Sequence, residues 1–157
     1  MTRSIVIRAP VGEVFEFAKD PSRFVAAIPD FTTQDAVLTP DGVGSVTHAT
    51  VHGLGMHFTG TVEYTEVVAE EKIVAKVSFP GEHPTWTFTF EPLDGQTRLT
   101  MRAQWHVNVP VVGRGIEAFK SREHGSMAEQ WLNAVKEHME PGAVAKNGES
   151  SVSDPDE

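Results

Sequence analysis

The sequence predicts an α+β fold: a seven-stranded antiparallel sheet wrapped around one long C-terminal helix, with two short helices after the first strand. Three observations predict this fold. An alternating segment opens the chain, six more strand-like segments separated by turn signals occupy residues 31–110 with no helix between them, and helical periodicity follows from about residue 111 to residue 139. Strands joined by short turns pair antiparallel, because a parallel pair needs a long crossover connection.

The first thirty residues hold one strand and two short helices. SIVIRAP, residues 4–10, alternates apolar and polar side chains and stops at proline, as a strand that enters a turn does. Residues 11–20 then place apolar side chains at helical spacing, and residues 21–31 form a second short helix that begins with proline.

The six central segments are divided by turn sequences. These are TPDG at 39–42, HGLG at 52–55, VAEEK at 68–72, FPGEHP at 79–84 and EPLDGQ at 91–96. If HGLGMH closes a tight hairpin, His52 lies across from His57, and His48 and His52 face solvent. Alternation places one mainly apolar face inward, made of Thr47, Ala49, Val51, Met56, Phe58, Gly60, Val62, Tyr64, Ile73, Ala75, Val77, Phe79, Trp86, Phe88, Phe90, Leu99, Met101, Ala103, Trp105 and Val107.

Small residues lie among the bulky side chains of this inner face, namely Ala49, Gly60, Ala75 and Ala103. One interpretation is that they leave volume for a cavity beside Trp86. The other is that they admit close helix packing or strand bending. Alternation by itself does not decide between the two.

The C-terminal helix carries two polar residues within its apolar side. At about 100° per residue its apolar side chains gather on one side, and Glu123 and Gln130 fall inside that sector. The carboxyl group of Glu123 has two interpretations. It faces an enclosed space, where loss of water would raise its pKa and let it donate a hydrogen bond or a proton, or it pairs with Arg or Lys at a rim.

Length and charge set limits on organisation and partners. We expect one domain at residues 1–140 and, because residues 141–157 are acidic and poor in apolar side chains, a disordered tail. The formal net charge of -9 argues against nucleic acid as a partner, since that partner needs a basic face. No segment approaches the roughly 20 apolar residues of a membrane span, and the N-terminus has too short an apolar run for a signal peptide. We therefore expect a cytoplasmic protein with no integral membrane association.

The element order, together with SIVIRAPVGEVFEFAKDPSRF at residues 4–24, resembles the START-like (SRPBCC) superfamily and, within it, the group often labelled polyketide cyclase/dehydrase. The resemblance covers about residues 3–139. It implies a helix-grip fold, in which a curved sheet holds the long helix and encloses a cavity for an apolar small molecule. IPDF at 28–31 with HFTGTVEY at 57–64 is also similar to the accessory proteins of carbon monoxide dehydrogenase, another branch of the superfamily.

This resemblance implies that the inner sheet face and the long helix line the ligand cavity. Glu123 and Tyr64 are the candidate catalytic residues if the protein is an enzyme, because a carboxyl group and a phenol are the acid–base groups offered to that space. We expect the ligand to contact Phe58, Tyr64, Trp86, Phe88, Met101, Trp105, Phe119, Glu123, Met127 and Gln130.

The residues predict neither a metal site nor a cofactor. Cysteine is absent, and His48 and His52 lie about 13 Å apart along an extended strand, too far to share an ion. His52 and His57 could approach across the hairpin, but two ligands fall short of the three or four that a site needs. The sequence also has no Gly-rich phosphate loop and no nucleophile–base motif.

The expected function is the binding or carriage of an apolar small molecule, lipid- or polyketide-like, between the sheet and the C-terminal helix. The alternative is a polyketide aromatase/cyclase or dehydratase-type enzyme that acts in the same cavity without a metal or nucleotide cofactor. A factor that acts through its surface, in assembly or as a toxin, is a third class. Because fold does not determine function, the sequence leaves the ligand, the catalysis, the pathway and the oligomeric state open.

Overall fold

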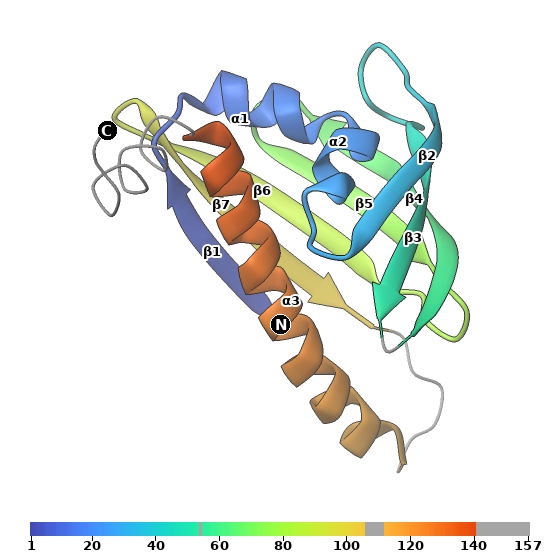
Figure 1. Ribbon diagram of the computed structural model, residues 1–157. Helices are drawn as coiled ribbons and strands as arrows, with labels where there is room; N and C mark the ends of the chain where they lie inside the picture. Colours follow the sequence, from blue (N-terminus) through green and yellow to red (C-terminus); the bar gives the residue numbers. More distant parts are fainter. Residues whose placement is uncertain (54, 106–111, 141–157) are drawn as a thin grey trace, which may run out of the picture.

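The computed structural model describes residues 1–53, 55–105 and 112–140, with the backbone alone described from 112 to 125. The chain runs through β1 (Thr2–Ile7), α1 (Val11–Ala18), α2 (Pro21–Ala26), β2 (Phe31–Val37), β3 (Val46–Gly53), β4 (Met56–Val68), β5 (Lys72–Ser78), β6 (Thr85–Leu93), β7 (Gln96–Gln104) and α3 (Val112–Met139) (Figure 1). The element order is the one that the sequence predicts.

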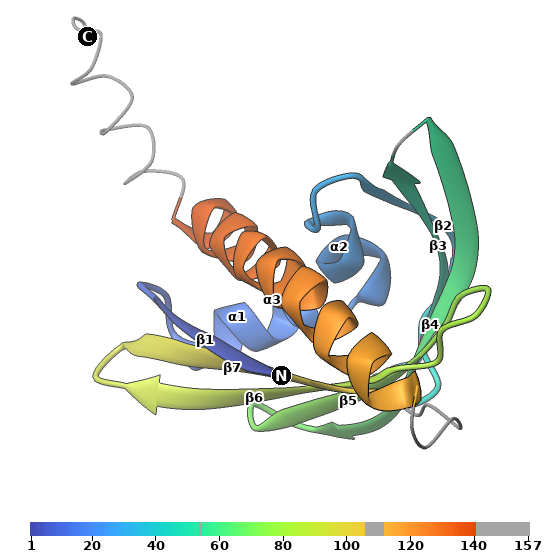
Figure 2. The ribbon, with the colours of Figure 1, turned by 90° about the horizontal axis from the view of Figure 1, so that it is seen from below.

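The seven strands form one antiparallel sheet in the order β1-β7-β6-β5-β4-β3-β2. From β2 to β7 each strand pairs with its neighbours along the chain, whereas β1 pairs with β7, so that β1 and β2 form the two edges. The sheet curves around α3, and α1 and α2 lie on the same concave side (Figure 2). The predicted α+β fold is therefore confirmed.

The first boundaries differ from the predicted ones. β1 covers Thr2–Ile7 rather than residues 4–10, and α2 ends at Ala26 rather than near residue 31. Pro29 has no backbone N–H to continue a helix, and Asp30 adopts a φ of 69°, in the left-handed region. The chain therefore leaves the helix at this point and turns into β2.

The β3–β4 hairpin has the predicted register. His52 lies opposite His57, and their ring centroids are 5.8 Å apart. At this end of the sheet, however, Met56 and Phe58 are 55% and 45% exposed, although alternation places them inward. The inner face of β4 becomes buried only further along the strand, where α2 packs on it.

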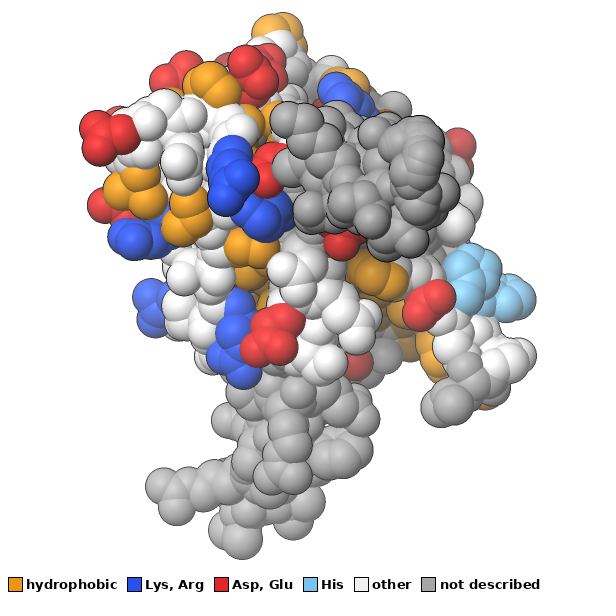
Figure 3. Space-filling model, turned by 60° about the vertical axis from the view of Figure 1, so that its left-hand side comes forward, with side chains coloured by type: hydrophobic (Ala, Val, Ile, Leu, Met, Phe, Trp, Pro, Cys, Tyr) orange, Lys and Arg blue, Asp and Glu red, His pale blue; other side chains and the backbone are white. Residues whose placement is uncertain are grey.

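Helix α3 is held against the sheet by a stripe of buried side chains at helical spacing, namely Ala128, Trp131, Leu132 and Val135. Two polar links join this helix to β1. Arg3 Nε lies 3.0 Å from Glu129 Oε2, and Lys136 Nζ donates to the carbonyl oxygen of Val6 at 2.8 Å. Acidic and basic side chains lie close together on this side of the molecule (Figure 3).

Helices α1 and α2 close one end of the concave side. Asp20 caps α2 by accepting hydrogen bonds from the Ser22 backbone N–H and hydroxyl, at 2.9 and 2.6 Å. Phe15 packs edge-to-face on Phe90, and Phe24 packs on Phe88, with ring centroids 5.5 and 4.8 Å apart. These contacts make this end of the sheet a filled hydrophobic core.

The predicted tail, residues 141–157, lies outside the described residues. Among the helices that are described, none combines the length and the hydropathy that crossing a membrane requires.

Candidate functional site

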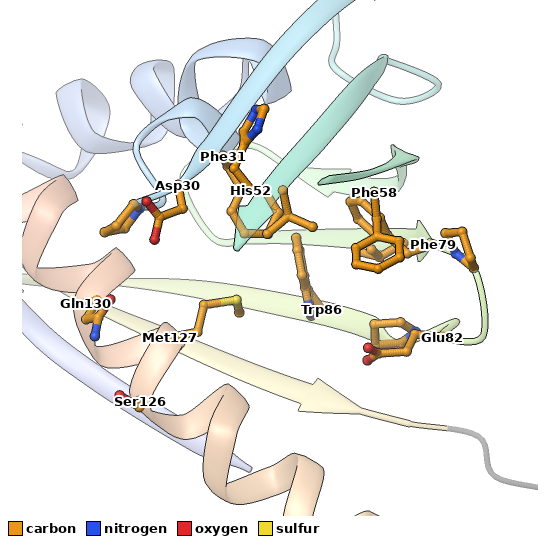
Figure 4. A pocket seen from close by; sticks show the side chains of 15 residues that line it. Asp30, Phe31, His52, Phe58, Phe79, Glu82, Trp86, Ser126, Met127 and Gln130 are labelled. Atoms are coloured by element: carbon orange, nitrogen blue, oxygen red, sulfur yellow. The ribbon is translucent and has the colours of Figure 1, made fainter. Parts of the chain in front are cut away.

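A cavity of about 520 Å³ lies between the open end of the sheet and α3. Its side chains come from β2, the β3–β4 hairpin, the turn after β5, the start of β6 and α3 (Figure 4). The lining residues are Pro29, Asp30, Phe31, Val51, His52, Phe58, Val77, Phe79, Pro80, Glu82, Pro84, Trp86, Ser126, Met127 and Gln130.

The turn between α2 and β2 builds one wall. Ile28 is 1% exposed and anchors the turn in the core, and its carbonyl oxygen accepts a hydrogen bond from the Phe31 N–H at 3.1 Å. The carbonyl oxygen of Asp30 accepts from the His52 N–H at 2.9 Å, which ties this turn to the end of β3. The Asp30 side chain and the Phe31 ring are thereby fixed at the edge of the cavity.

The turn after β5 builds the facing wall. Backbone hydrogen bonds of 2.9 Å run both ways between Phe79 and Glu82, and Gly81 between them has a φ of +79°. Proline at the second position and a positive-φ glycine at the third are typical of a type II turn. This short, closed turn directs the Phe79 ring to a place 6.2 Å from that of Phe31, edge to face.

Gly60 provides the space for the Phe79 ring. A Cβ atom at position 60 would lie 2.1 Å from the Ser78 carbonyl oxygen and 2.8 Å from two carbons of the Phe79 ring. Neither contact is possible without a shift of the backbone or the ring. The close-packing interpretation of this small residue is therefore correct, and the absence of a side chain here lets Phe79 form the wall.

Trp86 rises from the start of β6 between Met127 and the phenylalanine side chains (Figure 4). It is 3% exposed and packs edge-to-face on Trp131, with ring centroids 5.1 Å apart. Its indole Nε1–H has no hydrogen-bond partner among the described residues. Such a group is uncommon in a native protein, because a buried donor without an acceptor loses its hydration for nothing in return.

Helix α3 contributes Ser126, Met127 and Gln130 to the cavity. Ala128, Trp131 and Leu132, the neighbours of these residues in sequence, are buried instead. The helix thus has two adjacent faces, one that packs on the core and one that borders the cavity. The predicted position of Gln130 beside an open space agrees with this arrangement.

Polar side chains are a minority of the lining: Asp30, His52, Glu82, Ser126 and Gln130. The His52 ring points away from the cavity (Figure 4), and its Nε2 lies 3.4 Å from Thr32 Oγ1. The described lining residues include no Lys or Arg. In the described part of the chain, no group of three or more His, Asp or Glu side chains is placed to hold a metal ion.

The ten predicted ligand contacts divide into three groups. Phe58, Trp86, Met127 and Gln130 line the cavity. Tyr64, Phe88 and Met101 are each at most 1% exposed and pack in the core instead, while Trp105 is half-buried and is not among the lining residues. The side chains of Phe119 and Glu123, on α3, lie outside the described residues, and their roles stay predictions.

Tyr64 requires a correction. Its hydroxyl donates to the carbonyl oxygen of Ala18 at 2.6 Å, at the last residue of α1. Burial, with a smaller effect of the Asp20 charge, raises the pKa of Tyr64 well above its usual value of 10.0. A phenol that is buried, bonded and hard to ionise serves the end of α1 rather than a ligand or a reaction.

Most of the lining residues that the sequence did not identify lie in or beside turns. Pro29, Asp30 and Glu82 belong to segments whose side-chain directions no strand or helix period describes. Val77 and Phe79 were already on the predicted inner face, but alternation could not tell which end of that face stays open. The sequence signal that existed was the pair of turn motifs, IPDF and FPGEHP.

The comparisons with known proteins identify a family. The sequence matches the family described as Activator of Hsp90 ATPase homolog 1-like protein over residues 8–140. No curated protein matches the chain. Among solved structures, a START superfamily protein from Mycobacterium smegmatis is similar with a TM-score of 0.69 and 12% identity, over 90% of this chain and 97% of that one.

Two aromatase/cyclases have the same fold. Zhui aromatase/cyclase from Streptomyces sp. R1128 gives a TM-score of 0.63 and 21% identity, over 89% of this chain and 92% of that one. The di-domain ARO/CYC StfQ from the steffimycin biosynthetic pathway gives 0.71 and 16%, over 91% of this chain and 51% of that one.

At these identities the structural likeness shows the fold alone, and it confirms the START-like, helix-grip arrangement that the sequence predicts. The family match reaches from the end of β1 to the end of α3. The chain therefore belongs to the Activator of Hsp90 ATPase homolog 1-like protein family.

Proposed function

We propose that this protein binds or carries an apolar small molecule in the cavity between the sheet and α3. The observation that carries the proposal is the cavity itself, in which ten of the fifteen lining residues are apolar. Its volume of about 520 Å³ lies within the range of about 300–1,000 Å³ that is usual for small-molecule sites. Aromatic rings from β2, β4, the turn after β5 and β6 surround the space on several sides.

Burial of apolar surface supplies the binding free energy in such a site. A ligand that loses about 200 Å² of apolar surface from water gains roughly 5 kcal/mol, at about 25 cal/mol per Å². The loss of translational and rotational freedom on association offsets part of this gain. We therefore expect dissociation constants in about the micromolar range for simple apolar probes.

Native mass spectrometry of freshly purified protein tests the proposal. The expected result is an adduct with a co-purified apolar molecule, or binding of added lipid and aromatic probes. Met127→Arg, which places a charge at the cavity, should abolish the adduct. Met56→Arg is the matched control, because Met56 is 55% exposed and does not line the cavity. No adduct and no probe binding in the unmodified protein would contradict the proposal.

The enzymatic alternative is a cyclase or dehydratase acting in the same cavity. It is favoured by the carboxylate groups of Asp30 and Glu82 among largely apolar lining residues, since a carboxyl group there can act as acid or base. Glu123 stays a candidate for the same role. Turnover of an aromatic polyketide thioester that falls at least about tenfold in Asp30→Asn or Glu123→Gln would support this alternative, and no turnover in the unmodified protein would exclude it for that substrate.

A further inference from the structure

The cavity offers a hydrogen-bond donor that the fold itself does not use. We infer that the ligand is an uncharged, mainly apolar molecule with a hydrogen-bond acceptor, such as a carbonyl oxygen, which accepts from the indole N–H of Trp86. The inference rests on the proposed function, and it names the chemical class that this site selects.

Two neighbouring tryptophans show the difference between a used and an unused donor. Trp131 Nε1 donates to the Phe24 carbonyl oxygen at 2.9 Å. Trp86, whose ring packs on that of Trp131, has no such partner among the described residues, although it is 3% exposed. Since Trp86 also lines the cavity, an acceptor on the ligand can supply the missing bond after a small adjustment of the ring.

Gln130 supplies a second donor from α3. It lines the same cavity, and its side-chain amide makes no hydrogen bond within the described residues. In Figure 4 Gln130 and Trp86 border the cavity from the helix and from the sheet. A carbonyl-bearing ligand can therefore meet donors on both sides, whereas a pure hydrocarbon leaves both without a partner.

The charges around the cavity select against anions. Asp30 lines it and makes no ion pair within the described residues, and the carboxylate of Glu82 lines the facing wall. The described lining residues include no Lys or Arg to neutralise a ligand carboxylate, and the chain carries a net charge of -9. A neutral ketone is thus preferred over a carboxylate of the same shape.

Three probes of similar shape separate these effects: 2-acetylnaphthalene, 2-isopropylnaphthalene and 2-naphthoate. Their dissociation constants are measured by calorimetry for the unmodified protein, Trp86→Phe and Trp105→Phe. Because the two neutral probes differ in hydrophobicity, the informative quantity is the ratio of their constants, which cancels that difference between variants. Trp105→Phe is the matched control, since Trp105 is not among the lining residues.

The ratio should move about tenfold against the ketone in Trp86→Phe and stay unchanged in Trp105→Phe. In the unmodified protein, the Trp86 indole N–H resonance should shift with the ketone and much less with the hydrocarbon, which tests the bond without any substitution. Asp30→Asn should strengthen the binding of 2-naphthoate severalfold at low salt.

The outcomes are distinct. An unchanged ratio in a folded Trp86→Phe, or an N–H resonance that responds equally to both neutral probes, would overturn the role of Trp86. Naphthoate binding as tight as that of the ketone would overturn the selection against anions. Binding of the hydrocarbon alone would leave the proposed function in place, whereas the failure of all three probes to bind the unmodified protein would count against the proposed function itself.

Discussion

Trp131 on α3 donates its indole N–H to the carbonyl oxygen of Phe24 on α2 at 2.9 Å, inside the core. The same indole packs on the rings of Phe24, Trp86 and Phe88, with ring centroids 5.0–5.1 Å apart. One side chain therefore links the long helix to a short helix and to β6. This link separates the filled core from the cavity that begins at Trp86.

Trp131→Phe should destabilise the protein by about 1–3 kcal/mol, because it leaves a buried carbonyl oxygen without its donor and removes part of the packed ring. Urea unfolding followed by circular dichroism measures the change. Glu129→Gln is a control on the same helix, since its ion pair with Arg3 is exposed and contributes at most about 1 kcal/mol. A loss no larger than that of the control would contradict the structural role of Trp131.

Tyr64 gives a prediction that depends on pH. Its pKa is raised by burial, so above pH 10.0 the unfolded chain releases a proton that the folded protein retains. The unfolded state then binds fewer protons, and the free energy of unfolding must fall as the pH rises above 10.0. The full contribution is present below that pH.

Tyrosinate absorbance measures this directly, because Tyr64 is the single tyrosine of the chain. The absorbance should appear together with unfolding, and Tyr64→Phe should lack this part of the alkaline loss while costing about 1–2 kcal/mol at neutral pH. An ordinary titration near pH 10.0 in folded protein would place the phenol in water and contradict its position in the core.

Gly60→Ala should destabilise the protein by about 2 kcal/mol or more, since the new methyl group meets the Ser78 carbonyl oxygen and displaces the Phe79 ring. Gly53→Ala is the matched control on the neighbouring strand, because nothing lies within 4 Å of a Cβ there. Thermal unfolding of the two variants compares them. Equal melting temperatures would show that Phe79 does not rest on Gly60.

Residues 141–157 are proposed to be a dispensable tail. Glu140, the last described residue, accepts hydrogen bonds from the Arg8 backbone N–H and from Lys136 Nζ, so the anchoring contacts end there. Removal of the residues after Glu140 should change the free energy of unfolding by less than about 0.5 kcal/mol. Amide exchange on the full chain is the complementary measurement, and slow exchange beyond residue 140 would contradict the proposal.

The fold follows from local patterns to a large extent. Alternation, turn motifs and helical spacing each act over a few residues, and they suffice to predict seven antiparallel strands and the helix order. The hairpin register that places His52 opposite His57 follows from the short turn between them. Only the ends of the elements near Pro29 and Asp30 required information about backbone conformation.

The cavity was less predictable, for a physical reason. Tyr64, Phe88 and Trp86 all point to the same face of the sheet, but α1 and α2 fill the space over the first two and leave Trp86 at the boundary. A period of two residues gives the face and not what covers it. Side chains in turns, such as those of Asp30 and Phe79, take directions that only the folded backbone determines.

Methionine-methyl NMR tests the central claim, that an apolar ligand binds between the sheet and α3. The five methionines report from separate places: Met127 lines the cavity, Met101 lies in the core, and Met139 lies near the end of α3. Addition of 2-acetylnaphthalene to the unmodified protein should shift the Met127 methyl signal, saturably, and leave those of Met101 and Met139 in place. A saturable shift at Met139 with none at Met127, or no shift at any methionine, would contradict the account.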